Sequence, residues 1–243
     1  MFKLTTKGSE GLKTIIGLSN SLNDEAVINV TKDGLDFKVM DQDRSGLLDC
    51  TWKSETMVDF ECDGEHKIGI RTADILKVLK RAGKDDNIKL SHDGNGVLEI
   101  RVGENKVFSN RLVETDMIST GSTPKVKYEN SFPITHSALK EKVDDMLTIS
   151  ADFMEIRVNN GEIGFKVEDD GQKCETLYKN ESVVTNEEVT GKFSVSHLDN
   201  ALKQIKIESI DISILNNLPL CMAMTIVDMG VIKYYLAPVQ GGN

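Results

Sequence analysis

The stretch Leu35-Asp36-Phe37-Lys38-Val39-Met40-Asp41 decides the fold, because the chain contains it in two versions. It recurs as Ile163-Gly164-Phe165-Lys166-Val167-Glu168-Asp169, an offset of 128 residues (163 minus 35). The same offset relates the preceding Ile28-Asn29-Val30 to Ile156-Arg157-Val158. Self-similarity at a fixed offset is typical of a duplicated structural unit.

A second correspondence follows in the same order along the chain. Lys67-Ile68-Gly69-Ile70, followed by Asp74, matches Lys192-Phe193-Ser194-Val195, followed by Asp199, at an offset of 125 (192 minus 67). Chance produces one such match more easily than two in sequence at nearly equal spacing. The chain is therefore interpreted as two copies of one domain.

Each copy combines many strand patterns with two helical ones. Apolar spacing predicts helices over Ser9–Leu22, Thr72–Ala82, His136–Leu147 and Ser196–Ile205. Thr72 and Ser196 are the expected hydroxyl N-caps. Alternation predicts strands over Val27–Val39 with a turn at Asp33-Gly34, Glu155–Val167 with a turn at Asn160-Gly161, Asn87–Leu90, Val97–Val102 and Lys106–Val113. We expect an α+β fold in which each copy is an antiparallel sheet carrying two helices.

The end of the chain has the pattern of a hairpin. Two apolar runs, Cys221–Val227 and Val231–Leu236, flank a short turn with Asp228 and Gly230. In the second run Ile232, Tyr234 and Leu236 point to one face, and Tyr235 points to the other. Core packing explains this hairpin, and so does an apolar surface pocket formed by Tyr235 and the residues after it. The pattern alone leaves both interpretations open.

A polar segment separates the copies. Within 114–127, Ser119-Thr120-Gly121-Ser122-Thr123-Pro124 has the composition of a linker. We predict a first domain over 1–113, a connector over 114–127 and a second domain over 128–243.

The distribution of charge is more informative than its sum. The net charge is −10, from 39 acidic and 29 basic residues. With the apolar stripes of the helices turned toward the sheets, basic side chains face outward on or directly after all four helices. An outward lysine is usually just solvated, but four basic helices in an acidic chain indicate contact with a polyanion through phosphates rather than bases. These residues are Lys13, Lys77, Lys80, Arg81, Lys84, Lys140, Lys142, Lys203 and Lys206.

The sequence shows none of the common catalytic signatures. It has no P-loop, no GxGxxG after a strand, no GxSxG and no HExxH. The four histidines and four cysteines are dispersed, without a CxxC pair. Asp41 and Asp169 occupy equivalent positions after strands, where turns explain them better than a metal site does. We therefore expect a protein that is not an enzyme and uses no metal or cofactor. Because no run approaches about 18 apolar residues and the start lacks a signal-peptide core, we expect an intracellular protein that contacts no membrane.

Several of these stretches together resemble one family. Met40-Asp41 is followed by Ser45 and Leu47, Leu218-Pro219 precedes the last hairpin, and the chain ends with Asp228-Met229-Gly230 and Lys233-Tyr234-Tyr235-Leu236-Ala237-Pro238. Together with the repeat and the connector, these stretches resemble proliferating cell nuclear antigen (PCNA), the sliding clamp of archaea and eukaryotes. The absence of an acidic tail after Pro238 is similar to the archaeal type.

The resemblance implies the DNA clamp fold, with three subunits and six domains assembling into a ring around duplex DNA. Helices about 10 Å wide support this number, since twelve leave a hole of roughly 28 Å and eight only about 15 Å. Ring closure would pair a strand near Lys106–Leu112 with one near Lys173–Lys179 of the next subunit. Both a homotrimer and a heterotrimer fit the sequence.

The resemblance also implies a processivity factor that slides on DNA in the archaeal cytoplasm, at the nucleoid. It would tether DNA polymerase, the clamp loader (replication factor C), flap endonuclease and DNA ligase through their PIP-box motifs, for replication and repair. The implied partner-binding groove consists of Met40, Arg44, Ser45, Leu47, Met117, Ile118, Pro219, Tyr235, Leu236, Ala237 and Pro238. Arg44 stands where eukaryotic relatives usually have His, and the connector is more polar than theirs. The alternatives are a clamp-fold scaffold that does not encircle DNA and, remotely, a metal-dependent hydrolase using Asp41 and Asp169.

Overall fold

The computed structural model describes residues 1–129, 131–185, 187–227 and 229–239, and in it the repeated stretch forms the same hairpin twice. In the first copy, β2 (Glu25–Thr31) pairs antiparallel with β3 (Gly34–Met40), and in the second β11 (Phe153–Asn159) pairs with β12 (Glu162–Asp169). Phe37 and Phe165, which are equivalent in the repeat, are both fully buried. The repeat found in the sequence is therefore a repeat of strands and of core positions.

The first hairpin turn differs by one residue from the expectation of Asp33-Gly34. Thr31 lies opposite Gly34, so the turn consists of Lys32 and Asp33. Gly34 already belongs to β3, and its φ is +136°. A Cβ there would lie 2.0 Å from the Trp52 carbonyl oxygen, so this position requires glycine.

Internal contacts divide the chain into two units, each described by itself. Unit 1 consists of Met1–Gln42, Leu47–Ser122 and Thr225–Ile232, and unit 2 consists of Asp43–Gly46, Thr123–Met224 and the chain from Lys233. The last two strands, β16 (Leu220–Ile226) and β17 (Gly230–Leu236), have residues in both. The sequence-based domains 1–113 and 128–243, with their connector, stay a prediction.

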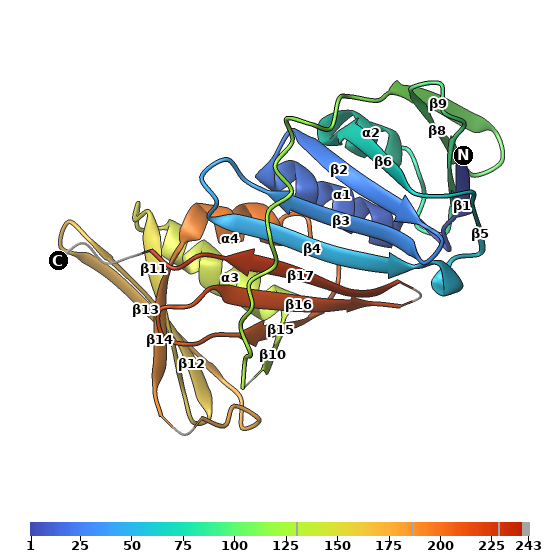
Figure 1. Ribbon diagram of the computed structural model, residues 1–243. Helices are drawn as coiled ribbons and strands as arrows, with labels where there is room; N and C mark the ends of the chain where they lie inside the picture. The colour runs from blue at the N-terminus through green and yellow to red at the C-terminus, as the bar shows by residue number, and fades with distance from the viewer. Residues whose placement is uncertain (130, 186, 228, 240–243) are drawn as a thin grey trace. The chain divides into compact units, whose positions relative to one another are not determined.

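Unit 1 packs two helices against antiparallel strands. One sheet has the order β5-β1-β7-β8-β9, and β4, β3, β2 and β6 pair in that order in another. Helices α1 and α2 pack together, α1 against β2 and β3 and α2 against β6 (Figure 1). The remaining bounds are β1 Phe2–Thr5, α1 Glu10–Leu22, β4 Gly46–Lys53, a 3₁₀ turn Ser54–Thr56, β5 Asp59–Cys62, β6 His66–Arg71, α2 Thr72–Leu79, β7 Ile88–His92, β8 Val97–Val102 and β9 Lys106–Arg111.

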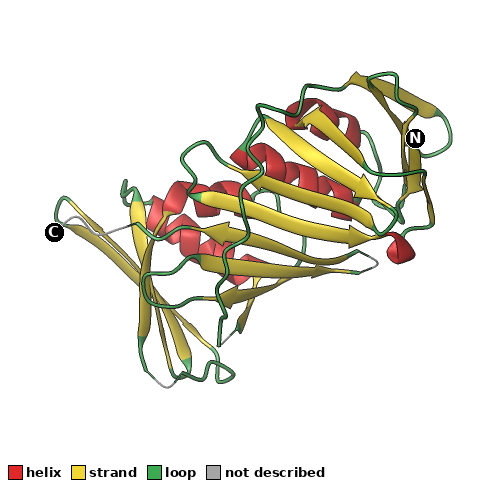
Figure 2. Ribbon diagram, in the orientation of Figure 1, coloured by secondary structure: helices red, strands yellow, loops and turns green. Residues whose placement is uncertain are grey.

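Unit 2 likewise packs two helices against antiparallel strands. Its strands form one sheet of order β13-β12-β11-β14, and β10, β15 and β16 pair antiparallel. Helix α3 packs on α4 and on β10, β12 and β13, while α4 contacts β11; Figure 2 shows these helices in red. The remaining bounds are β10 Phe132–Thr135, α3 His136–Leu147, β13 Gln172–Lys179, β14 Val189–Ser194, α4 Val195–Leu202 and β15 Ser209–Ser213. The α+β fold with two helices for each copy is thus confirmed.

The second helix of each copy ends earlier than its apolar pattern predicts. Helix α2 ends at Leu79 rather than Ala82, and α4 ends at Leu202 rather than Ile205. The next amides bond three residues back, Ala82 N to Leu79 O at 3.0 Å and Ile205 N to Leu202 O at 3.2 Å. Each helix therefore closes in a tighter final turn, which keeps the apolar residue inward without extending the α-helix.

The expected N-caps are wrong by one or two positions. Arg71 is the N-cap residue of α2 and provides no side-chain cap, while the Thr72 hydroxyl donates to the Asn23 carbonyl at 2.9 Å. In α4 the cap is Ser194, whose Oγ accepts from the His197 amide at 3.4 Å, and Ser196 lies inside the helix. Hydroxyls cluster around each helix start, and the sequence did not show which one faces the free amides.

The strand β9 ends at Arg111 rather than Val113, and β16 begins at Leu220 and ends at Ile226. In β17, Ile232, Tyr234 and Leu236 are all buried, as the alternation predicted for the core face. Asp228 of the expected turn lies outside the described residues. Within the described chain, no helix has the length and apolar character needed to span a membrane.

Candidate functional site

Basic side chains gather on the paired helices of unit 1. Lys77 on α2 is exposed, and Lys80 and Arg81 directly after α2 are exposed as well. Lys13 on α1 is half-buried and donates to the Ala82 carbonyl at 2.7 Å. Lys77 pairs with Asp74 at 3.2 Å. The cations of this helix pair therefore share one surface region, and Lys80 and Arg81 have no ion pair within the described chain.

Lys84 extends this basic region beyond α2. It is exposed and lies 3.9 Å from a carboxylate oxygen of Glu10, at the start of α1. This distance is at the limit of an ion pair and both groups are in water, so the interaction contributes little. Lys84 thus remains able to contact an anion.

The lysines of unit 2 are bound to carboxylates much more tightly. Lys140 on α3 contacts Asp144 one turn later and lies 3.6 Å from Asp199 on α4. Lys203 after α4 lies 2.5 Å from the other oxygen of Asp199. The hydrogen bond to Asp144 is the main cause that raises the pKa of Lys140 above its usual range. The positive charge of this helix pair is therefore largely balanced within the unit.

The last two predicted basic residues differ from each other. Lys142 is half-buried and pairs with Glu141 at 2.9 Å. Lys206, after the end of α4, is exposed and has no ion pair in the part of the chain that the structure describes. Lys140, Lys142 and Lys203 are thus ion-paired, whereas Lys206 has no carboxylate partner among the described residues.

In unit 1, the predicted partner-binding residues lie at the junction of β3 and β4. Met40 at the end of β3 pairs with Leu47 of β4. The connector passes directly over this pair, because a Cβ on Gly121 would lie 2.8 Å from Met40 Sδ and 3.1 Å from Leu47 Cδ1. Met117 of the connector is 92% exposed and Ile118 is half-buried. This arrangement leaves an apolar side chain of the connector in solvent.

In unit 2, the loop Asp43–Gly46 carries Arg44 and Ser45. Arg44 is exposed and has a left-handed backbone, with φ of 58°. The Ser45 carbonyl accepts from the Ala237 amide at 2.6 Å, directly after β17. Pro238 cannot donate, and the next amide, that of Val239, bonds to the Lys192 carbonyl at 2.8 Å. The segment after β17 is thus held at two points.

Tyr235 and Leu236, two of the predicted groove residues, are both buried. Tyr235 is only 5% exposed, and Leu236 is 1% exposed on the core face with Tyr234. Leu236 therefore supports the segment from the core side.

Sequence reasoning missed Tyr128. The Tyr128 hydroxyl donates to the Pro219 carbonyl at 2.7 Å, just before β16. Burial raises the pKa of Tyr128 well above its usual range and that of Cys221 to about 11. An aromatic residue after a polar connector was the available signal. Sequence reasoning also missed His197, whose Nε2 lies 3.1 Å from Ser45 Oγ.

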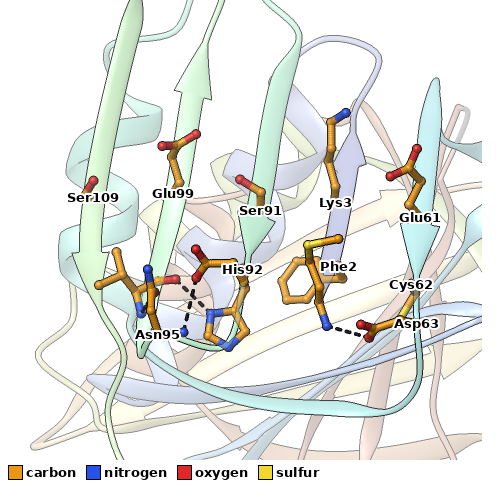
Figure 3. A pocket seen from close by; sticks show the side chains of 13 residues that line it. Phe2, Lys3, Glu61, Cys62, Asp63, Ser91, His92, Asn95, Glu99 and Ser109 are labelled. Atoms are coloured by element: carbon orange, nitrogen blue, oxygen red, sulfur yellow. Dashed lines mark hydrogen bonds and ion pairs between the residues drawn. The ribbon is translucent and has the colours of Figure 1, made fainter.

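A hollow lies elsewhere, on the solvent face of the sheet β5-β1-β7-β8-β9 in unit 1 (Figure 3). Its volume is about 600 Å³, and none of the predicted site residues lines it. One row of side chains crosses the sheet in register, namely Glu61, Lys3, Ser91, Glu99 and Ser109. At its end Met1 contacts Asp63 at 2.5 Å, and His92 Nδ1 bonds to the Val97 carbonyl at 2.9 Å. The hollow is a solvated sheet face whose opposite charges alternate.

A metal centre was the remote alternative for Asp41 and Asp169. Asp41 is buried at the end of β3, and Asp169 is exposed at the end of β12. Among the described residues, no group of three or more His, Cys, Asp or Glu is placed to hold a metal ion.

Comparison with known proteins gives a consistent result. Residues 1–119 match the family described as proliferating cell nuclear antigen, N-terminal domain. The DNA polymerase sliding clamp of Nitrosopumilus maritimus is 29% identical over 244 residues, and that of Pyrococcus horikoshii is 27% identical over 245 residues. Both alignments cover 98% of this chain and 98% of the relative.

Solved structures show the same fold. PCNA from Thermococcus kodakaraensis superposes with a TM-score of 0.88 at 19% identity, covering 98% of this chain and 100% of that one. PCNA of A. fulgidus, solved with the C-terminal region of FEN-1 bound, has a TM-score of 0.88 at 18% identity and full coverage of both chains. Residues 1–119 belong to the PCNA family, and the resemblance to archaeal sliding clamps extends over the whole chain.

Proposed function

We propose that this chain, as a member of the PCNA family, is a DNA sliding clamp that encircles duplex DNA and tethers DNA polymerase and other replication and repair enzymes. The observation that carries the proposal is the pairing of basic helices in both units of a duplicated α+β chain of net charge −10. An acidic protein with exposed basic side chains on its helices attracts DNA to those helices.

Ring formation is proposed from two unpaired strand edges. Within the described residues, β9 pairs only with β8 and β13 pairs only with β12. Val107 on β9 is 49% exposed and Leu177 on β13 is 44% exposed. Edges with free amides and exposed apolar side chains are sites for pairing with another chain. We propose that β9 of one copy pairs with β13 of the next and that three copies close the ring, as a homotrimer or with related chains.

The DNA contacts in this proposal are loose and independent of sequence. Lys77, Lys80, Arg81 and Lys84 are long, exposed cations that reach phosphates without fixed geometry. The ion-paired Lys140 and Lys203 contribute less. Retention then comes from enclosure, and weak contacts permit sliding along the duplex.

Partner binding is proposed at the residues around the connector and after β17. In unit 1 the proposed residues include the exposed Met117, and in unit 2 they are Arg44, Ser45, Pro219, Ala237 and Pro238. The PCNA of A. fulgidus was solved with the C-terminal region of FEN-1 bound. We extend this to PIP-box motifs of DNA polymerase, clamp loader, flap endonuclease and DNA ligase. Met40, Leu47 and Ile118 are the further predicted residues of unit 1, and the buried Tyr235 and Leu236 are those of unit 2.

The proposed activity is topological, so it uses no catalytic residue, metal or cofactor. The protein acts where the chromosome is replicated, inside the cell and at the nucleoid.

Retention on closed DNA tests the proposal. The chain is loaded with a clamp loader onto nicked circular plasmid, and clamp–DNA complexes are separated by gel filtration before and after the plasmid is cut once. We expect retention on the circle and loss within minutes of linearisation, because a ring slides off a free end. Equal retention on both forms contradicts encirclement and favours a clamp-fold scaffold that binds DNA or proteins without enclosing the duplex.

A further inference from the structure

The loop Asp43–Gly46 is held inside unit 2, although β3 before it and nearly all of β4 after it belong to unit 1. Its central anchor is the imidazole of His197, in the first turn of α4. His197 Nε2 lies 3.1 Å from Ser45 Oγ, and Nδ1 lies 3.1 Å from Ser194 Oγ. A helix terminus thus fixes a loop that lies 152 residues away in sequence.

Ser45 connects this anchor to the end of the chain. Its hydroxyl meets His197, and its carbonyl accepts from the Ala237 amide at 2.6 Å. Both contacts depend on where the backbone of Ser45 lies. A displacement of the loop that breaks the His197 contact therefore also pulls the carbonyl away from Ala237.

The neighbouring Arg44 makes this dependence stronger. Its backbone has φ of 58°, a left-handed conformation that non-glycine residues adopt only when the surroundings hold them there. The two contacts on Ser45, one on the side chain and one on the carbonyl, help to hold the preceding Arg44 in this conformation. Without them the loop is expected to relax toward a more common conformation.

The imidazole suits this position chemically. A hydroxyl both donates and accepts, so Ser45 and Ser194 can satisfy the two ring nitrogens in either tautomer. Ser194 is fixed in turn as the N-cap of α4, accepting from the His197 amide. His197 therefore links the capped start of α4 to the loop Asp43–Gly46.

We propose that His197 is a positioning residue for partner binding: it fixes Ser45, and through the Ser45 carbonyl it fixes Ala237 and Pro238 for the peptide. This inference rests on the proposed partner-binding role of the segment after β17. His197 does not need to contact the peptide, so its effect is on the geometry of residues that do.

Substitutions at His197 separate this role from simple packing. Gln places an amide group near the position of Nε2, whereas Asn reaches only the position of Nδ1. We expect His197→Ala and His197→Asn to weaken binding of a fluorescein-labelled synthetic PIP-box peptide about 3- to 10-fold, the effect of one lost hydrogen bond. His197→Gln should stay within about twofold of the wild type. Ser196→Ala removes a neighbouring hydroxyl that lies 3.0 Å from Ser194 Oγ and has no contact with Ser45 among the described residues. It is the matched control and should change nothing.

Ser45→Ala removes the other side of the same hydrogen bond, the hydroxyl that meets His197, and leaves α4 unchanged. We expect the same loss as for His197→Ala, and no further loss in the double variant, because both remove one contact. Anisotropy titration gives the affinities, and hydrogen–deuterium exchange gives the protection of the Ala237 amide. Unchanged affinity and protection in both single variants, or losses that multiply in the double variant, overturn the inference. A wild type that does not bind the peptide refutes the proposed partner role, whereas exchange at Ala237 still decides whether His197 positions the segment.

Discussion

Lys140 of α3 and Asp199 of α4 join the two helices of unit 2, with Nζ 3.6 Å from Oδ1. The second oxygen of Asp199 lies 2.5 Å from Lys203, and the carboxylate is only 7% exposed. One buried carboxylate thus balances two lysines that the sequence had suggested for DNA contact. Its counterpart in the first copy, Asp74, is exposed and pairs only with Lys77 at 3.2 Å.

Asp199→Asn is expected to lower the free energy of unfolding by about 1–3 kcal/mol, because it removes the charge of the one buried carboxylate that faces both Lys140 and Lys203. Asp74→Asn, the matched control, should change it by less than about 0.5 kcal/mol, as for other exposed pairs. Urea unfolding monitored by circular dichroism measures both. Equal effects of the two substitutions would contradict a special role for the buried carboxylate.

The exposed cations Lys80 and Arg81 are expected to dominate DNA contact. Each phosphate contact contributes a slope of about −0.9 to the dependence of log K on log salt concentration. Lys80→Ala with Arg81→Ala should therefore make this slope shallower by roughly 1–2 and weaken binding at low salt. Fluorescence anisotropy with a duplex at several salt concentrations gives the slope.

Lys166→Ala is the control for that measurement. Lys166 lies on the solvent face of β12 and pairs with Glu168 at 2.9 Å, away from the helices. The same loss of slope in this variant would show that only net charge matters, and the assignment of DNA contact to the helices would then be wrong.

The sequence predicted the repeat, and with it the fold, because duplicated strands preserve their apolar positions. Phe37 and Phe165 are buried at equivalent places, and all four helices were expected at nearly the correct bounds. The last turn of α2 and α4 was not predictable from spacing, since a 3₁₀ turn keeps the same residues inward.

The sites were less predictable, because each depends on contacts between distant parts of the chain. The lysine pattern identified Lys80 and Lys140 equally, whereas in the structure Asp144 and Asp199 both face Lys140 and balance its charge. His197 and Tyr128 were missed for the same reason. Their partners, Ser45 and Pro219, lie 152 and 91 residues away.

Burial should make two of the four cysteines unreactive. It raises the pKa of Cys50 to about 12 and that of Cys221 to about 11, so both stay protonated near neutral pH and both are buried. Cys62 and Cys174 are partly exposed. We expect rapid alkylation of Cys62 and Cys174 at pH 7.5, and of all four only after denaturation, as followed by mass spectrometry. Rapid native labelling of Cys50 would contradict the burial.

Ring closure adds an expectation for Cys174, which lies on the edge strand β13. If β13 pairs with β9 of another copy, Cys174 should react more slowly at high protein concentration than after dilution. Cys62 on β5, an edge strand of the other sheet, serves as the internal reference. A constant ratio of the two rates, with a trimer present by mass photometry, would exclude β13 as the interface.

Acid should weaken two ion pairs on the sheet of unit 2. Hydrogen bonds from Lys166 and Lys173 lower the pKa values of Glu168 and Glu175 below their usual 4.5. A lowered pKa in the folded state contributes stability above pH 4.5, and this contribution is lost as pH falls through the folded value. In Lys166→Met and Lys173→Met, carbon-detected NMR titration should return the partner carboxylate toward 4.5. An unchanged titration in either variant would rule out that pairing in solution.

The Tyr128 hydroxyl is expected to hold Pro219 in the partner-binding position. Tyr128→Phe removes the 2.7 Å bond to the Pro219 carbonyl while keeping the aromatic ring. The loss of one hydrogen bond corresponds to about 0.5–1.5 kcal/mol, so PIP-box peptide binding should weaken about 2- to 10-fold.

Tyr235→Ala should weaken peptide binding further and also lower the stability of the fold, because this ring is only 5% exposed. Isothermal titration calorimetry measures the affinity of each variant for the peptide, and mass photometry measures whether each variant still forms a trimer. If either variant dissociates the proposed trimer without a change in peptide affinity, these aromatic residues belong to the core that supports the subunit and not to its docking surface.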